Sequence, residues 1–237
     1  MVKFCLIGGK VNRDYISNKI ESHLLSLINK EKPKILFCPY AAKDIEKTNN
    51  KFKELVKDLN CDVIYLNYNN IYDFDKLLNE SDILYISGGI SDDLVDIFYK
   101  YNLDKILIKY LDSNKIYAGI SAGAMLYTKI SMGDKYMYSD NFHNYNYKMV
   151  KCLGLLNISI CPHYQNEDLI IYNDEIKKYN LDSFGIEEDS ALIIDDNKYY
   201  VIKEKKNVSL YYFSKNDYIM QDLKENIVYE KDGGFRS

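Results

Sequence analysis

The sequence predicts an α/β fold, in which a mostly parallel sheet is covered by helices on both faces and antiparallel strands follow at the C-terminal end. Three observations support it. Short apolar runs alternate with helical patterns through the first half of the chain. These runs are continuously apolar, as is typical of strands buried on both faces. Near the C-terminus, short strand patterns are separated by Asp, Asn and Lys turns.

Each element follows from its own pattern. Apolar residues at helical spacing mark the helices, and short apolar runs mark the strands. The predicted strands are 2–7, 34–38, 62–66, 82–87, 115–119, 155–161, 191–194, 199–202, 208–213 and 227–229. The predicted helices are 13–30, one marked by Phe52, Leu55, Val56 and Leu59, 74–78, one broken or two consecutive helices over 94–111, and 169–178. A polar, tyrosine-rich loop over 131–148 is long enough to suggest a functional role.

Length and composition bound the possibilities. The chain has 237 residues, 47% of them hydrophobic, and no Pro/Gly/Ser-rich linker, so we expect one domain over 1–237. A net charge of −4 argues against nucleic-acid and anionic-membrane partners, which require a basic surface. No run of about 18 apolar residues is present, and we expect a cytoplasmic protein. The five scattered cysteines lack C-x-x-C spacing and are expected to be buried thiols.

A run of small residues surrounds Ser121. The sequence Gly119-Ile120-Ser121-Ala122-Gly123-Ala124 follows a predicted strand and leads into a helical pattern. This is the pattern of a nucleophile elbow, a turn so sharp that bulky neighbours would collide while the serine hydroxyl stands clear of the sheet. Small residues around a serine also occur in ordinary strand-to-helix turns. The pattern therefore indicates a catalytic serine only if a base and a carboxylate accompany it.

A serine nucleophile needs a base, usually a histidine held by a carboxylate. His23 falls beside the apolar stripe of the first helix, where packing accounts for it, and His143 falls in the tyrosine-rich loop, where exposure to solvent accounts for it. His163 follows a predicted strand and Pro162. We therefore expect His163 at the same sheet edge as Ser121 and assign it as the base.

Two carboxylates compete for the third position. Glu188 lies in a Gly-Ile-Glu-Glu loop just before a strand, and Asp140 lies between the serine and the histidine in sequence. For both, the alternative is an acidic side chain that is simply exposed in a turn. The Gly88-Gly89 turn is expected to contribute the N–H of Gly89 to an oxyanion hole, together with the N–H of Ala122.

Taken together, these segments resemble peptidase family S51, which includes dipeptidase E and cyanophycinase. The matching segments are 87–89, 119–125, 153–156, 161–164 and 185–192. The resemblance implies a fold like the class I glutamine amidotransferases, with Ser121 as nucleophile, His163 as base and the oxyanion donors named above. Cyanophycinase-like members carry a Glu that matches Glu188, whereas the Asp described for dipeptidase E has Asp140 as its nearest match. We favour Glu188.

The segment after His163 departs from the family. Recognition of an aspartyl carboxylate in dipeptidase E is associated with an arginine there, and this chain has only Arg13 and Arg236. Lys177 or Lys178 could offer a cation, without the bidentate geometry of a guanidinium. In addition, Ile90 and Ser91 stand where family members commonly have Asn or Asp with Thr or Gln.

The sequence thus predicts a serine peptidase that acts on dipeptides or short peptides through an acyl-enzyme, with the 131–148 loop closing the site. We expect no metal or organic cofactor and a small peptide substrate, and a homodimer is compatible with the sequence. Two alternatives remain open, namely an esterase or amidase on another small acyl substrate and a catalytically silent binding domain on the same scaffold.

Overall fold

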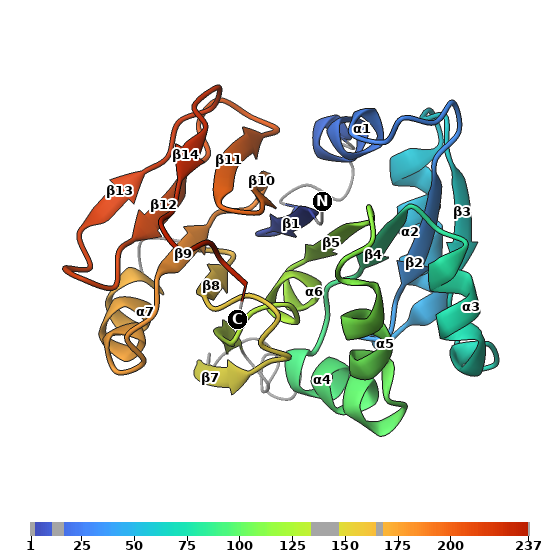
Figure 1. Ribbon diagram of the computed structural model, residues 1–237, viewed down its shortest axis with the longest axis horizontal. Coiled ribbons are helices and arrows are strands. Elements are labelled where there is room, and N and C mark those ends of the chain that lie inside the picture. The colour runs from blue at the N-terminus through green and yellow to red at the C-terminus, as the bar shows by residue number, and fades with distance from the viewer. Residues whose placement is uncertain (1–2, 11–16, 134–146, 165–167, 237) are drawn as a thin grey trace.

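The computed structural model describes residues 3–10, 17–133, 147–164 and 168–236. The fold is built around a central sheet (Figure 1). In this part of the chain the sheet has eight strands in the order β14-β11-β10-β1-β5-β4-β2-β3. Its strands are β1 Lys3–Ile7, β2 Lys34–Cys38, β3 Asp62–Tyr65, β4 Ile83–Ile86, β5 Ile116–Ile120, β10 Ser190–Asp195, β11 Lys198–Lys203 and β14 Tyr229–Glu230. Strands β1 to β5 are mutually parallel. Strand β10 pairs antiparallel with β1, β11 with β10 and β14 with β11. This mostly parallel sheet with antiparallel C-terminal strands confirms the predicted fold class.

Helices cover both faces of this sheet. On one face, α1 Lys19–Ser26 and α2 Ile45–Val56 bury Ile20, Leu24, Phe52 and Val56 against alternate strand residues. The other face carries α3 Phe74–Asn79 with the short η1 Ile71–Asp73 before it, α4 Ser91–Lys100, α5 Leu103–Tyr110 and α6 Ala122–Met125. The apolar runs of the parallel strands are buried between these two layers, as their composition predicts.

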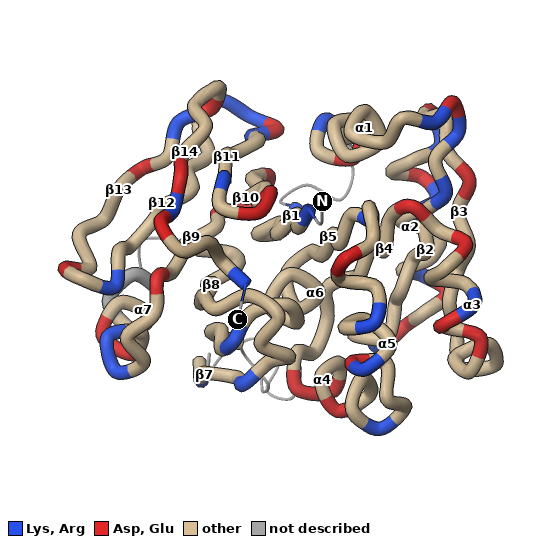
Figure 2. Tube along the Cα trace, viewed as in Figure 1, with Lys and Arg blue, Asp and Glu red and all other residues tan. Residues whose placement is uncertain are grey.

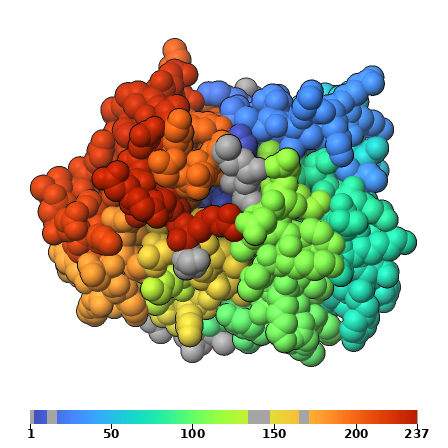
Figure 3. All heavy atoms as spheres, viewed as in Figure 1, coloured from blue at the N-terminus to red at the C-terminus, as the bar shows by residue number. Residues whose placement is uncertain are grey.

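A second sheet, which the sequence did not predict, is formed by four further strands of the described residues. Its order is β13-β12-β9-β8, with β8 Ser159–Pro162, β9 Ser183–Ile186, β12 Leu210–Phe213 and β13 Met220–Asp222. The prediction that the C-terminal strands all extend the central sheet is therefore wrong for 208–213. Helix α7 Asp168–Lys177 connects β8 to β9, which are parallel. Figure 3 shows the C-terminal strands, orange to red, at one end of the molecule and the N-terminal elements, blue to green, at the other.

Two boundaries differ from the prediction. Of the helix predicted over 13–30, residues 13–16 lie outside the described residues, and the structure shows α1 Lys19–Ser26. The helix ends before residue 30 because its last turn tightens, with the N–H of Leu27 bonding the Leu24 carbonyl and that of Ile28 bonding the Leu25 carbonyl. The predicted strand 155–161 is extended only from Ser159. The first and last described parts of the tyrosine-rich stretch pair as β6 Ile130–Gly133 and β7 Lys148–Lys151, and residues 134–146 lie outside the described residues.

The distribution of charged residues and the burial of the cysteines can be compared with what the composition predicts. Along the chain trace, acidic and basic residues are interspersed (Figure 2). Cys5, Cys38, Cys152 and Cys161 are buried, as predicted, whereas Cys61 is partly exposed. Among the described residues, no helix is long and apolar enough to cross a membrane.

Candidate active site

Ser121 occupies a sharp turn between β5 and α6. Its backbone has φ 54° and ψ −118°, a left-handed conformation that is costly for a residue with a side chain. Two glycines allow the turn to close. A Cβ on Gly119 would lie 2.3 Å from the carbonyl carbon of Gly123, and one on Gly123 would lie 2.3 Å from the Ile86 oxygen. The small residues around Ser121 are therefore required by the close approach of β5, α6 and the end of β4.

His163 lies between Ser121 and Glu188. Its Nε2 is 2.8 Å from Oγ of Ser121, and its Nδ1 is 2.8 Å from Oε1 of Glu188. In serine hydrolases this arrangement lets an imidazole take the hydroxyl proton while a carboxylate orients the ring and stabilises its charged form. The Glu188 side chain is 24% exposed and the His163 side chain 45% exposed. Ser121 is itself partly exposed and lines a pocket.

The neighbours of Glu188 have other contacts. Glu187 accepts a hydrogen bond of 2.7 Å from the N–H of Ser209, and Asp189 forms an ion pair of 2.5 Å with Lys205. Of these three acidic residues, the structure places Glu188 beside the His163 ring. The alternative acid, Asp140, lies outside the described residues, as does His143.

The end of β1 connects the three loops that carry these side chains. The carbonyl of Ile7 accepts a hydrogen bond of 2.9 Å from the N–H of Ser121. The next carbonyl, Gly8, accepts one of 3.2 Å from His163, and the carbonyl of Gly9 accepts one of 2.8 Å from Asp189. The expectation that His163 shares a sheet edge with Ser121 is wrong, because β8 belongs to the second sheet. The two side chains meet because their loops bond to consecutive residues, the Ser121 loop to Ile7 and the His163 loop to Gly8.

Gly9 is a residue that the sequence reasoning missed. A Cβ at this position would lie 2.5 Å from Cε1 of the His163 ring and 3.0 Å from Cγ of Glu188. At Gly8, a Cβ would lie 2.3 Å from the Ile186 oxygen. The paired glycines after the first strand were the available signal, but a glycine pair that ends a strand is also an ordinary turn.

The Gly88-Gly89 turn lies against Ser121. A Cβ on Gly88 would be 3.1 Å from Cβ of Ser121. Gly89 has φ 150°, and a Cβ there would be 1.8 Å from the Ala41 oxygen, so only glycine fits. Ala122 is the first residue of α6. Within the described residues, neither the N–H of Gly89 nor that of Ala122 donates a hydrogen bond, and the assignment of both as oxyanion donors stays a prediction.

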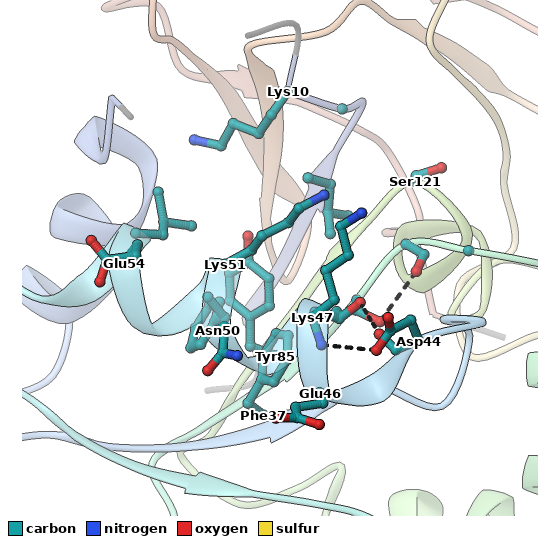
Figure 4. Close-up of a pocket in the computed structure, with 18 of the residues that line it drawn as sticks. Lys10, Phe37, Asp44, Glu46, Lys47, Asn50, Lys51, Glu54, Tyr85 and Ser121 are labelled. Atoms are coloured by element: carbon teal, nitrogen blue, oxygen red, sulfur yellow. Dashed lines mark hydrogen bonds between the residues drawn. The ribbon is translucent and has the colours of Figure 1, made fainter. Parts of the chain in front are cut away.

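A pocket of about 760 Å³ opens from Ser121 and His163 toward α2 (Figure 4). Its wall is formed by the β1 end, the Gly88-Gly89 turn and the exposed face of α2. The charged residues that line it are Lys10, Asp44, Glu46, Lys47, Lys51 and Glu54. Among the described residues, no group of three or more His, Cys, Asp or Glu is arranged to hold a metal ion.

Other candidates from the sequence lie elsewhere. His23 contacts the hydroxyl of Tyr200 at 2.9 Å, in agreement with its predicted packing role, and burial lowers its pKa. At the C-terminal end of α7, Lys177 pairs with Asp174, and Lys178, the next residue, pairs with Glu175. Neither lysine lines the pocket. A contribution of either lysine to this pocket is therefore not supported.

A buried ionic cluster supports the pocket wall behind Gly9. Lys10 lies 3.2 Å from Glu21 and 2.7 Å from Glu204, whose side chains are 1% and 0% exposed. Ser17 donates a hydrogen bond to Glu204, and Tyr85 donates one of 2.9 Å to Glu21. Burial raises the pKa of Glu21 despite the opposing charge of Lys10. Burial would also raise the pKa of Glu204, but Lys10 and the hydrogen bonds outweigh it and lower that pKa.

We expect Glu204→Gln to destabilise the protein by about 3 kcal/mol at pH 7, since it leaves Lys10 with one buried partner fewer. Because the pKa of Glu204 is lowered, its stabilising contribution is present above its ordinary pKa of 4.5 and is lost as the pH falls through the lowered value. The difference in unfolding free energy from wild type, measured by urea denaturation, should therefore shrink below about pH 4.

The control is Glu230→Gln, which removes an exposed partner 3.7 Å from Lys198. It should cost less than about 0.5 kcal/mol. An equal effect of the two substitutions, or no dependence of the Glu204→Gln effect on pH, would contradict this account of the cluster.

Comparisons with known proteins agree with the geometry. The model of peptidase family S51 matches residues 4–202. The chain is 24% identical over 210 residues to the uncharacterized peptidase YgaJ of Bacillus subtilis, covering 86% of this chain and 88% of that protein.

Solved structures share the fold. A peptidase from an acI-B1 actinobacterium superposes with a TM-score of 0.72 at 20% identity, covering 97% of this chain and 96% of that one. A Listeria monocytogenes structure assigned to peptidase E superposes with a TM-score of 0.63 at 19% identity, covering 86% of this chain and 98% of that one. The family match spans most of the chain and includes Ser121, His163 and Glu188. The chain therefore belongs to peptidase family S51 and is a serine-type peptidase.

Proposed function

We propose that this peptidase hydrolyses dipeptides or short peptides through an acyl-enzyme on Ser121. The observation that carries the proposal is the placement of His163, with one ring nitrogen 2.8 Å from the Ser121 hydroxyl and the other 2.8 Å from Glu188. A serine hydroxyl is a weak nucleophile near neutral pH, and an oriented imidazole removes that limitation.

In the proposed mechanism, Oγ of Ser121 attacks the scissile carbonyl while Nε2 of His163 takes its proton. The charged ring is stabilised by the Glu188 carboxylate at Nδ1. His163 then donates the proton to the leaving amine as the C–N bond breaks, which leaves an acyl ester on Ser121. Water attacks the ester with His163 again as base, so that the acid product leaves and the hydroxyl is restored.

The tetrahedral intermediates carry an oxyanion, and we assign its donors to the N–H groups of Gly89 and Ala122. Support comes from the close approach of the Gly88-Gly89 turn to Ser121 and from the position of Ala122 at the start of α6. A glycine in the turn allows the backbone to approach a ligand closely. Removing one such donor typically costs about 3 to 4 kcal/mol of transition-state stabilisation.

The pocket volume supports a small substrate. About 760 Å³ lies within the usual range for small-molecule sites and accommodates a dipeptide or short peptide rather than a folded chain. The predicted closure by the 131–148 loop concerns residues that are largely outside the described chain, and it stays a prediction.

Ser121→Ala should abolish labelling by a fluorophosphonate probe and lower kcat for short peptides by roughly 10⁴-fold or more, because the nucleophile is removed. The measurement compares a panel of dipeptides with p-nitrophenyl esters, using the wild type and the variant. Ester hydrolysis without cleavage of any peptide would favour an esterase, and absence of labelling in the wild type would favour a binding domain without catalysis.

Glu188→Gln tests the carboxylate. We expect kcat to fall by about 10²- to 10⁴-fold, since the amide favours the wrong tautomer of the imidazole and no longer stabilises its charge. Glu187→Gln is the matched control, because it changes the adjacent residue and keeps an acceptor for the Ser209 N–H. A kcat that responds equally to both substitutions would reject Glu188 as the partner of His163.

Gly9→Ala tests the room that the imidazole requires. The added methyl group would lie 2.5 Å from the His163 ring, so we expect the ring to be displaced and kcat/KM to fall by about 10²-fold. The circular dichroism spectrum and thermal midpoint show whether the fold survives. Full activity in a folded Gly9→Ala protein would contradict the importance of this contact.

A further inference from the structure

The residues that follow β11 hold the turn that carries Glu188. Asp189, the next residue in that turn, is 5% exposed and has φ 60°, a left-handed conformation that is uncommon for a residue with a side chain. Its carbonyl accepts a hydrogen bond of 2.8 Å from the N–H of Glu204, and its carboxylate pairs with the Lys205 ammonium at 2.5 Å. Both contacts fix the residue whose N–H bonds to the carbonyl of Gly9.

The Glu204 side chain fastens the same turn to the end of β1. Its carboxylate is 0% exposed and lies 2.7 Å from the ammonium of Lys10, the residue after Gly9. Gly9 bonds to Asp189, and Asp189 bonds to Glu204, through the backbone. The ion pair of Lys10 with Glu204 is the side-chain contact that closes this ring. In Figure 4 the Lys10 side chain extends away from Ser121, toward this cluster.

Stability alone does not account for the buried pair of Lys10 and Glu204. Removing charges from water is unfavourable, and apolar residues of similar volume in place of a buried ion pair often leave a protein equally stable or more stable. Burial would raise the pKa of Glu204, but Lys10 and the hydrogen bonds lower it, so the carboxylate stays charged at neutral pH. The geometry that the pair imposes is the better explanation for it.

That geometry bears on the contact between His163 and Glu188. Gly9 packs against both side chains, since a Cβ there would lie 2.5 Å from the His163 ring and 3.0 Å from Cγ of Glu188. A shift of the Glu188 turn relative to Gly9 would therefore change the hydrogen bond of 2.8 Å between Nδ1 of His163 and Oε1 of Glu188. Such a bond weakens steeply when its angle is distorted.

We propose that Glu204 and Lys205 are positioning residues of this peptidase, which hold the turn at Asp189 so that the Glu188 carboxylate faces His163. The inference rests on the proposed function, since it requires Glu188 to orient the base. Neither Glu204 nor Lys205 lines the pocket. Both therefore act on kcat through Glu188 and leave substrate binding unchanged.

Glu204→Gln should lower kcat for short peptides by about tenfold or more and change KM by less than about threefold, because the turn is displaced while the pocket is intact. Each kcat is measured per active site titrated with a fluorophosphonate, so that unfolded protein does not contribute.

Glu21→Gln is the matched control, because Glu21 is the other buried carboxylate beside Lys10 and lies on α1. It should lower kcat by less than about threefold. An equal fall in kcat for Glu21→Gln and Glu204→Gln, or a wild-type kcat in folded Glu204→Gln, would overturn the assignment of Glu204.

Lys205→Gln is a second variant that leaves the buried cluster intact. The Lys205 side chain is 42% exposed, so the fold should survive the loss of its ion pair. We expect kcat to fall by about two- to fivefold. Lys206→Gln removes the same charge one residue away and should leave kcat unchanged. A wild-type kcat in the Lys205→Gln protein would overturn the assignment of Lys205.

Combined substitutions test the route through Glu188. In the Glu188→Gln background, Glu204→Gln and Lys205→Gln should each change kcat by less than about twofold, because the contact that they support is already lost. A further loss as large as in the wild type would show that the two residues act by another route, and would overturn the inference.

Hydrogen exchange at the Asp189 amide keeps this inference apart from the proposed function. In Glu204→Gln this amide should exchange at least about tenfold faster, relative to the Ser121 amide, than in the wild type. An unchanged ratio would overturn the positioning role of Glu204 whatever the activity. A wild-type protein that cleaves no peptide would overturn the proposed function, and faster exchange in the variant would still establish that Glu204 holds the turn.

Discussion

Three consecutive carbonyl groups at the end of β1 hold the site together. Those of Ile7, Gly8 and Gly9 accept hydrogen bonds from the N–H groups of Ser121, His163 and Asp189. All three acceptors belong to the same short segment, so no loop can move independently of the other two without breaking its hydrogen bond to that segment. The serine comes from the central sheet and the histidine from the second sheet, and β1 is the element that fixes one relative to the other.

The same segment shows why its residues are small. The chain must pass close enough to accept these bonds while leaving room for the imidazole, and a methyl group at Gly9 would lie only 2.5 Å from the ring. Ser121 adds a second constraint, since its left-handed backbone stores energy that the surrounding packing must offset. Gly119 and Gly123 allow that packing. These glycines therefore allow residues from the two sheets to approach each other closely enough to form one site.

The sequence was sufficient to predict much of this arrangement. The parallel strands were predictable because a short, continuously apolar run is stable only when both of its faces are buried. Ser121 was predictable because a sharp turn excludes bulky neighbours. The structure brings the His163 side chain to Ser121 without the shared sheet edge that the sequence suggested, since the pairing of β8 with β9 depends on long-range contacts that a four-residue strand does not specify.

Other features had no distinctive local signal. Gly9 resembles any glycine that ends a strand, and its role depends on a ring that lies far away in the chain, at His163. Glu204 and Lys205 resemble the charged residues of any turn after a strand, and only the tertiary structure brings them to Asp189.

The central claim is that the end of β1 holds the loops of Ser121, His163 and Asp189 as one unit. Native-state hydrogen exchange of these three backbone amides tests it most directly. The account predicts that all three exchange slowly and with a common free energy of opening, because one segment accepts all three bonds. Rapid exchange of the His163 or Asp189 amide while the Ser121 amide stays protected would contradict it.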